Sequence, residues 1–178
     1  ISNPDKNKKT LFIWPEGIFY ESNLKDIKKY KDLFDKKFSK KHLIILGVNS
    51  NIKNDQKIEN YYNSLVLLNS NLDIISIYNK INLVPFGEFL PLEDFLLPLG
   101  IKKVTPGYNS FSPGNERKLI NLGKDFYEKT ILPLICYEII YSGSIKNGYQ
   151  FPDLAINISE DAWFGKSIGP DQHFTKAI

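Results

Sequence analysis

Three side chains in this sequence have the chemistry needed for acyl transfer at a thiol, and each follows a short apolar run. Glu16 follows the run in "FIWPEG", Lys80 ends "ISIYNK", and Cys136, the only cysteine, ends "ILPLIC". A carboxylate can take the thiol proton as a general base. A lysine ammonium can stabilise the thiolate and then an oxyanion. Together these groups suffice for acyl transfer through a thioester.

Each of the three residues also has an ordinary structural interpretation. A lone cysteine in an apolar run is commonly an inert packing residue. Glu16 could be a turn carboxylate after Pro15, and Lys80 a solvated strand end. A thiol at a strand-to-helix turn, however, lies near a helix N-terminus, whose partial positive charge favours the thiolate. The functional interpretation therefore depends on whether the fold gathers all three groups.

The elements that must position these groups alternate between buried strands and helices. Apolar runs bounded by turn residues predict strands at 10–16, 42–49, 61–69, 73–80, 118–122, 129–138 and 152–159. The hairpin turn is expected at "SNLD", and polar "SNIKNDQKIEN" and Pro/Gly-rich "VTPGYNSFSPGN" are expected to be loops.

Helices are predicted in four places. Asn23 and Asp26 have the spacing of a capping box, and apolar residues then recur at helical spacing as far as Phe38. Further helices are expected at "LEDFLLPLG", from Glu138 in "EIIYSGSIKNG", and from Asp171 in "DQHFTKAI". Strands apolar on both faces, mixed with hairpins and amphipathic helices, indicate an α/β layered sandwich.

Composition sets limits on the function. A chain of 178 residues with 42% hydrophobic residues fits one globular domain spanning 1–178. The net charge of +3 comes from lysines that do not cluster with aromatic platforms, so no nucleic-acid partner is expected. No apolar stretch is long enough to span a membrane, and the chain begins without Met and stops inside a predicted helix. We therefore expect it to be part of a longer protein.

Four sequence blocks carry a family resemblance. "WPEG", "YNKINLVPFGEFLPL", "ICYEIIYSG" and "NISEDAWFGKSIGPDQH" resemble the nitrilase, or carbon–nitrogen hydrolase, superfamily. More narrowly, they resemble the periplasmic catalytic domain of the apolipoprotein N-acyltransferase family. The resemblance implies an α-β-β-α sandwich, here truncated at its C-terminal end, and membrane helices that this chain lacks.

The resemblance also implies residue roles. It makes Glu16 the general base, Lys80 the oxyanion-stabilising cation and Cys136 the nucleophile. Further supporting or substrate-binding positions are matched by Glu88, Tyr137, Glu138 and Trp163. No metal and no organic cofactor are expected, because His42 and His173 are far apart in the sequence and no ligand spacing surrounds them.

The implied activity is N-acylation in lipoprotein maturation. The acyl donor would be a phospholipid and the acceptor the N-terminal diacylglyceryl-cysteine of an apolipoprotein, at the periplasmic face of the bacterial inner membrane. Two alternatives stay open: a soluble superfamily amidase that hydrolyses a small carbon–nitrogen bond, and a non-catalytic remnant that binds lipid or a partner protein. The apolar segment "FLPLEDFLLPLG" is either a core-facing helix or an arm that touches lipid.

Overall fold

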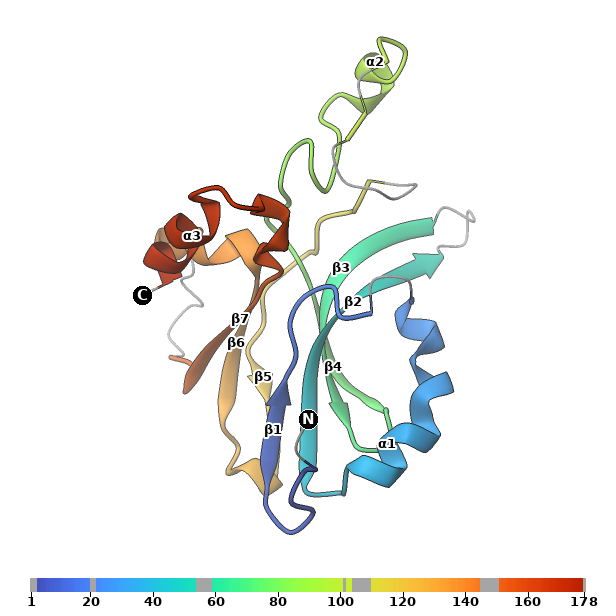
Figure 1. Ribbon diagram of the computed structural model, residues 1–178, viewed down its shortest axis with the longest axis vertical. Coiled ribbons are helices and arrows are strands. Elements are labelled where there is room, and N and C mark those ends of the chain that lie inside the picture. Colours follow the sequence, from blue (N-terminus) through green and yellow to red (C-terminus); the bar gives the residue numbers. More distant parts are fainter. Residues whose placement is uncertain are drawn as a thin grey trace.

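Two β-sheets pack face to face in the computed structural model, which describes residues 3–19, 22–53, 59–100, 102–103, 110–144 and 151–177 (Figure 1). The first sheet has the strand order β1-β2-β3-β4 and the second the order β5-β6-β7. β1 runs parallel to β2 and β6 parallel to β7, whereas the other neighbouring strands are antiparallel. This mixture of layered sheets and helices is the predicted α/β sandwich class.

The first sheet and its outer helices come from the N-terminal half of the chain. Their bounds are β1 (Thr10–Ile13), η1 (Leu24–Tyr30), α1 (Lys31–Lys37), β2 (His42–Lys53), β3 (Glu59–Asn69) and β4 (Ile74–Asn79). The remaining elements are α2 (Glu93–Leu96), β5 (Ile120–Asn121), η2 (Lys124–Phe126), β6 (Thr130–Ile135), η3 (Cys136–Ser144), β7 (Leu154–Ile158), η4 (Asp161–Phe164) and α3 (Gly169–Ala177).

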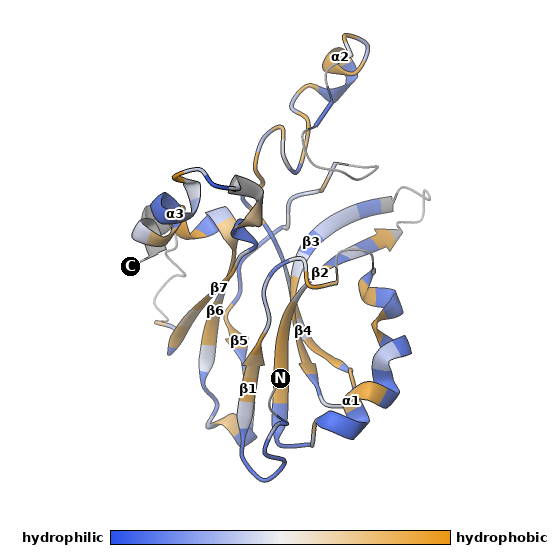
Figure 2. Ribbon diagram, viewed as in Figure 1, coloured by the Kyte–Doolittle hydropathy of each residue, from blue (hydrophilic) through white to orange (hydrophobic). Residues whose placement is uncertain are grey.

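The central strand β2 is buried on both faces, because alternate side chains of a strand point in opposite directions. Leu43 and Ile45 join the cluster between the two sheets, which also contains side chains of β6 and β7. Ile44 and Leu46 point the other way and pack under the helices η1 and α1. The apolar colouring along β2 in Figure 2 follows this double burial. The continuous apolar run "HLIILGV" is therefore what a two-faced core strand requires.

The first helix begins where the sequence predicts. Asn23 is the N-cap: its side chain accepts a hydrogen bond from the Lys25 amide at 3.1 Å, and Asp26 completes the capping box. Ile27 and Phe34 are the buried residues of the helical stripe. The helix starts as 3₁₀ (η1) and continues as α-helix (α1), so its cap and its apolar face were both predicted correctly.

Several boundaries differ from the sequence-based expectation, among them the ends of β1 at Ile13 and β6 at Ile135 and the start of α3 at Gly169. The polar segment "SNIKNDQKIEN" is not a loop throughout, because β2 extends to Lys53 and β3 starts at Glu59 in one long antiparallel ladder. The strand expected at 118–122 is shorter than predicted, because only Ile120–Asn121 (β5) pair as a strand. The helix expected from Glu138 begins at Cys136 itself, as 3₁₀. Half of "VTPGYNSFSPGN", residues 104–109, lies outside the described residues.

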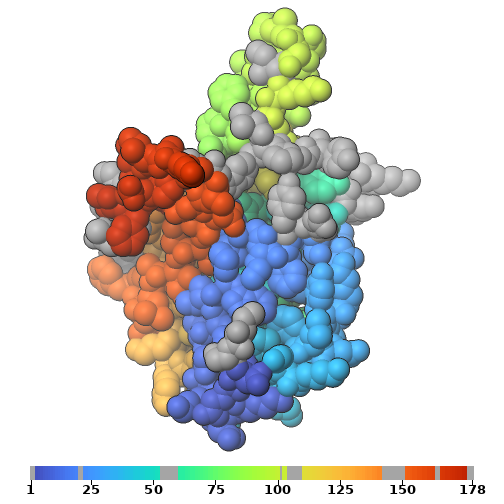
Figure 3. All heavy atoms as spheres, in the orientation of Figure 1, coloured from blue at the N-terminus to red at the C-terminus, as the bar shows by residue number. Residues whose placement is uncertain are grey.

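The apolar segment around α2 projects from the body of the molecule (Figures 1 and 3). Leu92 is 78% exposed and Phe95 65% exposed, and Leu97 and Leu99 are exposed as well. The core-facing interpretation of this helix is therefore wrong. Among the described residues, no helix has the length and apolar character needed to cross a bilayer.

Candidate active site

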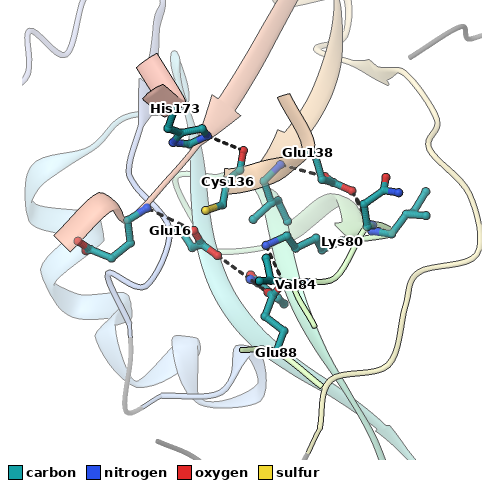
Figure 4. Close-up of polar contacts among 12 residues, drawn as sticks. Glu16, Lys80, Val84, Glu88, Cys136, Glu138 and His173 are labelled. Carbon is teal, nitrogen blue, oxygen red and sulfur yellow. Dashed lines mark hydrogen bonds and ion pairs between the residues drawn. The ribbon is translucent and has the colours of Figure 1, made fainter. Parts of the chain in front are cut away.

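The structure brings together the three groups that the sequence singled out. Glu16 follows β1, Lys80 directly follows β4, and Cys136 directly follows β6. Figure 4 shows the sulfur of Cys136 directed toward the Glu16 carboxylate and the Lys80 ammonium, with Glu88 beside Lys80. Because strand ends from both sheets meet at this edge of the sandwich, residues far apart in the sequence become neighbours.

Lys80 and Glu88 form a buried ion pair. Lys80 is 1% exposed and Glu88 7% exposed, and the distance from Nζ to Oε2 is 2.8 Å. The backbone amide of Val84 donates to the same carboxylate oxygen at 2.9 Å. Burial alone would lower the pKa of Lys80, but the carboxylates of Glu88 and Glu16 outweigh it and raise that pKa. The lysine is therefore held as a cation.

Asn63 on β3 connects the two glutamates. Its side-chain amide donates to Glu16 Oε1 at 2.6 Å and to Glu88 Oε1 at 2.8 Å. A neutral donor between two carboxylates orients both without removing either charge. Asn63 was not singled out in the sequence, because an asparagine inside a strand has no distinguishing local pattern.

The backbone of Glu16 lies tightly against β2. A Cβ atom at Gly47 would come within 2.6 Å of Glu16 Cα, so only glycine allows this approach. The Glu160 amide donates to Glu16 Oε2 at 3.2 Å. Burial raises the pKa of Glu16, although Lys80 and Asn63 act in the opposite direction. A raised pKa makes this carboxylate a stronger base for a thiol proton.

Cys136 is buried and has a backbone φ of 51°, a left-handed conformation that is unusual for a residue with a side chain. Burial and the nearby Glu16 carboxylate raise the pKa of its thiol to about 11, against the lowering effects of Lys80 and Ser159. Desolvation and the Glu16 carboxylate therefore outweigh the charge of Lys80, and the thiol stays protonated beside a carboxylate.

Glu138 ties the cysteine turn to the lysine turn. It is completely buried, and its Oε2 accepts from the Ile135 amide at 3.0 Å. Its Oε1 accepts from the amides of Ile81 and Asn82 at 2.9 and 3.2 Å. These contacts fix the residues next to Cys136 and next to Lys80 against each other.

The charge of Glu138 is compensated by the chain's single arginine. Arg117 Nη2 lies 2.7 Å from Glu138 Oε1, and the Tyr78 hydroxyl donates to the same oxygen at 2.7 Å. Arg117 Nε also donates to the Tyr78 hydroxyl oxygen at 3.1 Å. Glu138 therefore braces the site through buried hydrogen bonds and points away from the thiol (Figure 4).

Tyr137 and Trp163 differ from the other predicted residues. Tyr137 is partly exposed and lines a surface pocket between η3 and α3, where its ring stacks on His173 at 6.0 Å between centroids. The Trp163 side chain lies outside the described part of the structure. Within the described residues, no three His, Cys, Asp or Glu side chains are grouped as metal ligands would be.

Comparison with known proteins places the chain in a family. The carbon–nitrogen hydrolase family matches residues 32–177. The chain belongs to this family. Among curated relatives, the apolipoprotein N-acyltransferase of Rhizobium leguminosarum bv. trifolii is 34% identical over 96% of this chain and 31% of its own length. That of Rickettsia typhi is 37% identical over 92% of this chain and 32% of its own length. The expected resemblance to N-acyltransferases is confirmed, and the chain spans about a third of these relatives.

A solved structure of the same fold supports the architecture. The glutamine-dependent NAD+ synthetase of Acinetobacter baumannii superposes with a TM-score of 0.56 at 19% identity, over 92% of this chain and 28% of the synthetase chain. At this identity the similarity concerns the fold alone. The nitrilase-like sandwich inferred from the sequence blocks is therefore confirmed by the arrangement of the two sheets.

Proposed function

We propose that this chain is the catalytic part of an apolipoprotein N-acyltransferase that works through a thioester on Cys136. The observation that carries the proposal is the buried grouping of a protonated thiol, a carboxylate of raised pKa and a lysine held as a cation. Family membership and the names of the matched relatives support the choice of lipoprotein acylation over other acyl transfers.

In the first half-reaction, the Glu16 carboxylate takes the proton from the Cys136 thiol. The sulfur attacks the sn-1 ester carbonyl of a phospholipid, and the Lys80 ammonium stabilises the resulting oxyanion. When the carbon–oxygen bond breaks, Glu16 returns its proton to the departing oxygen. Lysophospholipid leaves, and the acyl chain remains as a thioester on Cys136.

In the second half-reaction, the acceptor is the α-amino group of an N-terminal diacylglyceryl-cysteine. The amine attacks the thioester carbonyl, Glu16 accepts a proton from the nitrogen, and the carbon–sulfur bond breaks. The thiolate regains its proton from Glu16, and the products are an amide and a free enzyme. A thioester suits this exchange because amines attack it more readily than they attack an ester.

The exposed arm around α2 supports a lipid substrate. The arm begins directly after Glu88, and its apolar side chains Leu92, Phe95, Leu97 and Leu99 are exposed. Phe86, which precedes Glu88 by two residues, is exposed as well. Exposed apolar side chains of this kind insert into a bilayer boundary. The arm would place the site next to phospholipid at the periplasmic face of the inner membrane.

Intact-mass analysis of the full-length protein after exposure to phospholipid vesicles tests the proposal. We expect a mass increase of one acyl group that maps to Cys136 and is absent in Cys136→Ala. Adding a diacylglyceryl-peptide with a free α-amino group should remove the adduct and N-acylate the peptide. An unmodified wild-type thiol, together with rapid turnover of small soluble amides, would instead identify an amidase.

A further inference from the structure

His173 on α3 makes two hydrogen bonds that the proposed chemistry does not use. Its Nε2 lies 2.9 Å from the backbone carbonyl oxygen of Cys136 (Figure 4), and its Nδ1 lies 2.9 Å from Asp161 Oδ1. The histidine is only 5% exposed. A buried polar ring held between two partners from different elements is a specific arrangement rather than a solvated surface histidine.

Both partners of the ring are hydrogen-bond acceptors. A peptide carbonyl only accepts, and so does an ionised carboxylate, whereas a neutral imidazole has one N–H and one acceptor nitrogen. Burial would raise the pKa of Asp161, but hydrogen bonds from Ser159 and His173 lower it, so Asp161 is a carboxylate. The two contacts are satisfied together only if both ring nitrogens carry protons.

The contacts form a closed chain that starts and ends on the nucleophile residue. The Ser159 hydroxyl donates to Asp161 Oδ1 at 2.6 Å, and the Ser159 side chain also hydrogen-bonds with the Cys136 thiol. Asp161 then holds His173, and His173 holds the Cys136 carbonyl. The left-handed backbone of Cys136 is an unfavourable conformation that surrounding contacts must maintain.

We infer that Asp161 and a doubly protonated His173 form a clamp that holds the backbone of Cys136 in its strained conformation and so aims the thiol at Glu16 and Lys80. His173 is a positioning residue in this clamp and does not touch the reacting atoms. The groups that face its ring are Asp161 from η4, Cys136 and Tyr137 from η3, with Tyr137 stacked at an interplanar angle of 19°. This inference depends on the proposed function only in the experiments that measure acyl transfer.

Two amide substitutions in the full-length protein separate the two contacts. In His173→Gln, the side-chain amide can replace Nε2 and still donate to the Cys136 carbonyl. In His173→Asn, the amide can replace Nδ1 and reach Asp161, but the contact to the carbonyl is lost. We expect acyl-enzyme formation to be at least about tenfold slower in His173→Asn than in His173→Gln, because a lost buried hydrogen bond has that order of effect. KM for phospholipid should be the same in both variants.

Two readouts do not depend on acyl transfer. Alkylation of Cys136 by iodoacetamide, followed by peptide mapping, should show the same order of rates for the two variants. In wild-type protein labelled with ¹⁵N-histidine, both ring nitrogens of His173 should give the signals of protonated nitrogens. Loss of acyl transfer with these two results intact would overturn the proposed function and leave the clamp standing.

Two results would overturn the clamp. The first is equal alkylation rates in His173→Asn and His173→Gln at equal thermal stability, which would show that the carbonyl contact does not position the thiol. The second is a ¹⁵N spectrum with one unprotonated ring nitrogen. If both variants fail to fold, the ¹⁵N spectrum of the wild-type protein still decides the protonation state on which the inference depends.

Discussion

The ammonium of Lys80 lies 2.8 Å from the carboxylate of Glu88, and both side chains are almost completely buried beside the thiol of Cys136. Two opposite charges in a desolvated site stabilise each other, and removing one leaves the other without compensation. This pair therefore has two roles: it holds the cation that the proposed oxyanion needs, and it makes the site's stability depend on both partners.

Removing one partner of this pair should cost more stability than removing both. We expect Glu88→Gln to lower the free energy of unfolding by about 3–5 kcal/mol, because the buried Lys80 charge loses its ion-pair partner. The double variant Lys80→Met/Glu88→Leu should be clearly more stable than Glu88→Gln. Thermal melts of the full-length proteins measure this order, and a double variant less stable than the single one would contradict it.

Glu16→Gln should change thiol reactivity and acyl transfer in opposite directions. The Glu16 carboxylate raises the pKa of Cys136 to about 11 together with burial, so removing its charge lowers that pKa. The pH profile of iodoacetamide alkylation should then move to lower pH, while acyl-enzyme formation falls by at least about 10²-fold through loss of the base.

Lys80→Met is the matched control for this experiment. Lys80 lowers the thiol pKa, so its removal should move the alkylation profile to higher pH. Movement of the two profiles in the same direction would show that one of the two charges does not act on the thiol as the geometry indicates.

Gly47→Ala should disturb the site although it changes none of the reactive side chains. The new Cβ would come 2.6 Å from Glu16 Cα, so the backbone of Glu16 must shift away from β2. A displacement of the base by a fraction of an ångström to one ångström lowers rates by on the order of 10²-fold. We expect acyl-enzyme formation to fall by this order with KM little changed.

Gly87→Ala provides the comparison for Gly47→Ala. Its Cβ would meet nothing closer than 3.4 Å, which is ordinary van der Waals contact. Rates near those of the wild type are expected, and a loss as large as that in Gly47→Ala would point to a general sensitivity to alanine.

Charges placed on the arm should impair lipid access alone. In Leu92→Asp/Phe95→Asp, two highly exposed apolar side chains become carboxylates that resist insertion into a bilayer. We expect slower acyl-enzyme formation from phospholipid vesicles and an unchanged alkylation rate at Cys136. Leu33→Asp changes a leucine on α1 that is 60% exposed and should leave both rates unaltered. A vesicle-specific loss in Leu33→Asp would remove the distinction between the arm and the rest of the surface.

Local sequence patterns predicted the elements that local physics determines. The capping box at Asn23 and the two-faced apolar run of β2 were recognisable because both depend on neighbouring residues and on periodicity. The polar ends of β2 and β3 were missed because their strand conformation comes from the ladder between them, for example the pairing of Asn51 with Tyr61. The apolar segment at α2 was ambiguous because composition cannot tell a buried helix from an exposed one.

The sequence by itself determined which groups have suitable chemistry and that each of them, Glu16, Lys80 and Cys136, follows an apolar strand in the chain. Only the tertiary structure decided their surroundings. It placed Asn63 between two glutamates, turned Glu138 into a brace, and set His173 on the carbonyl of Cys136. It also decided the protonation of the thiol, because a pKa depends on burial and on charges that the chain brings close only when it folds.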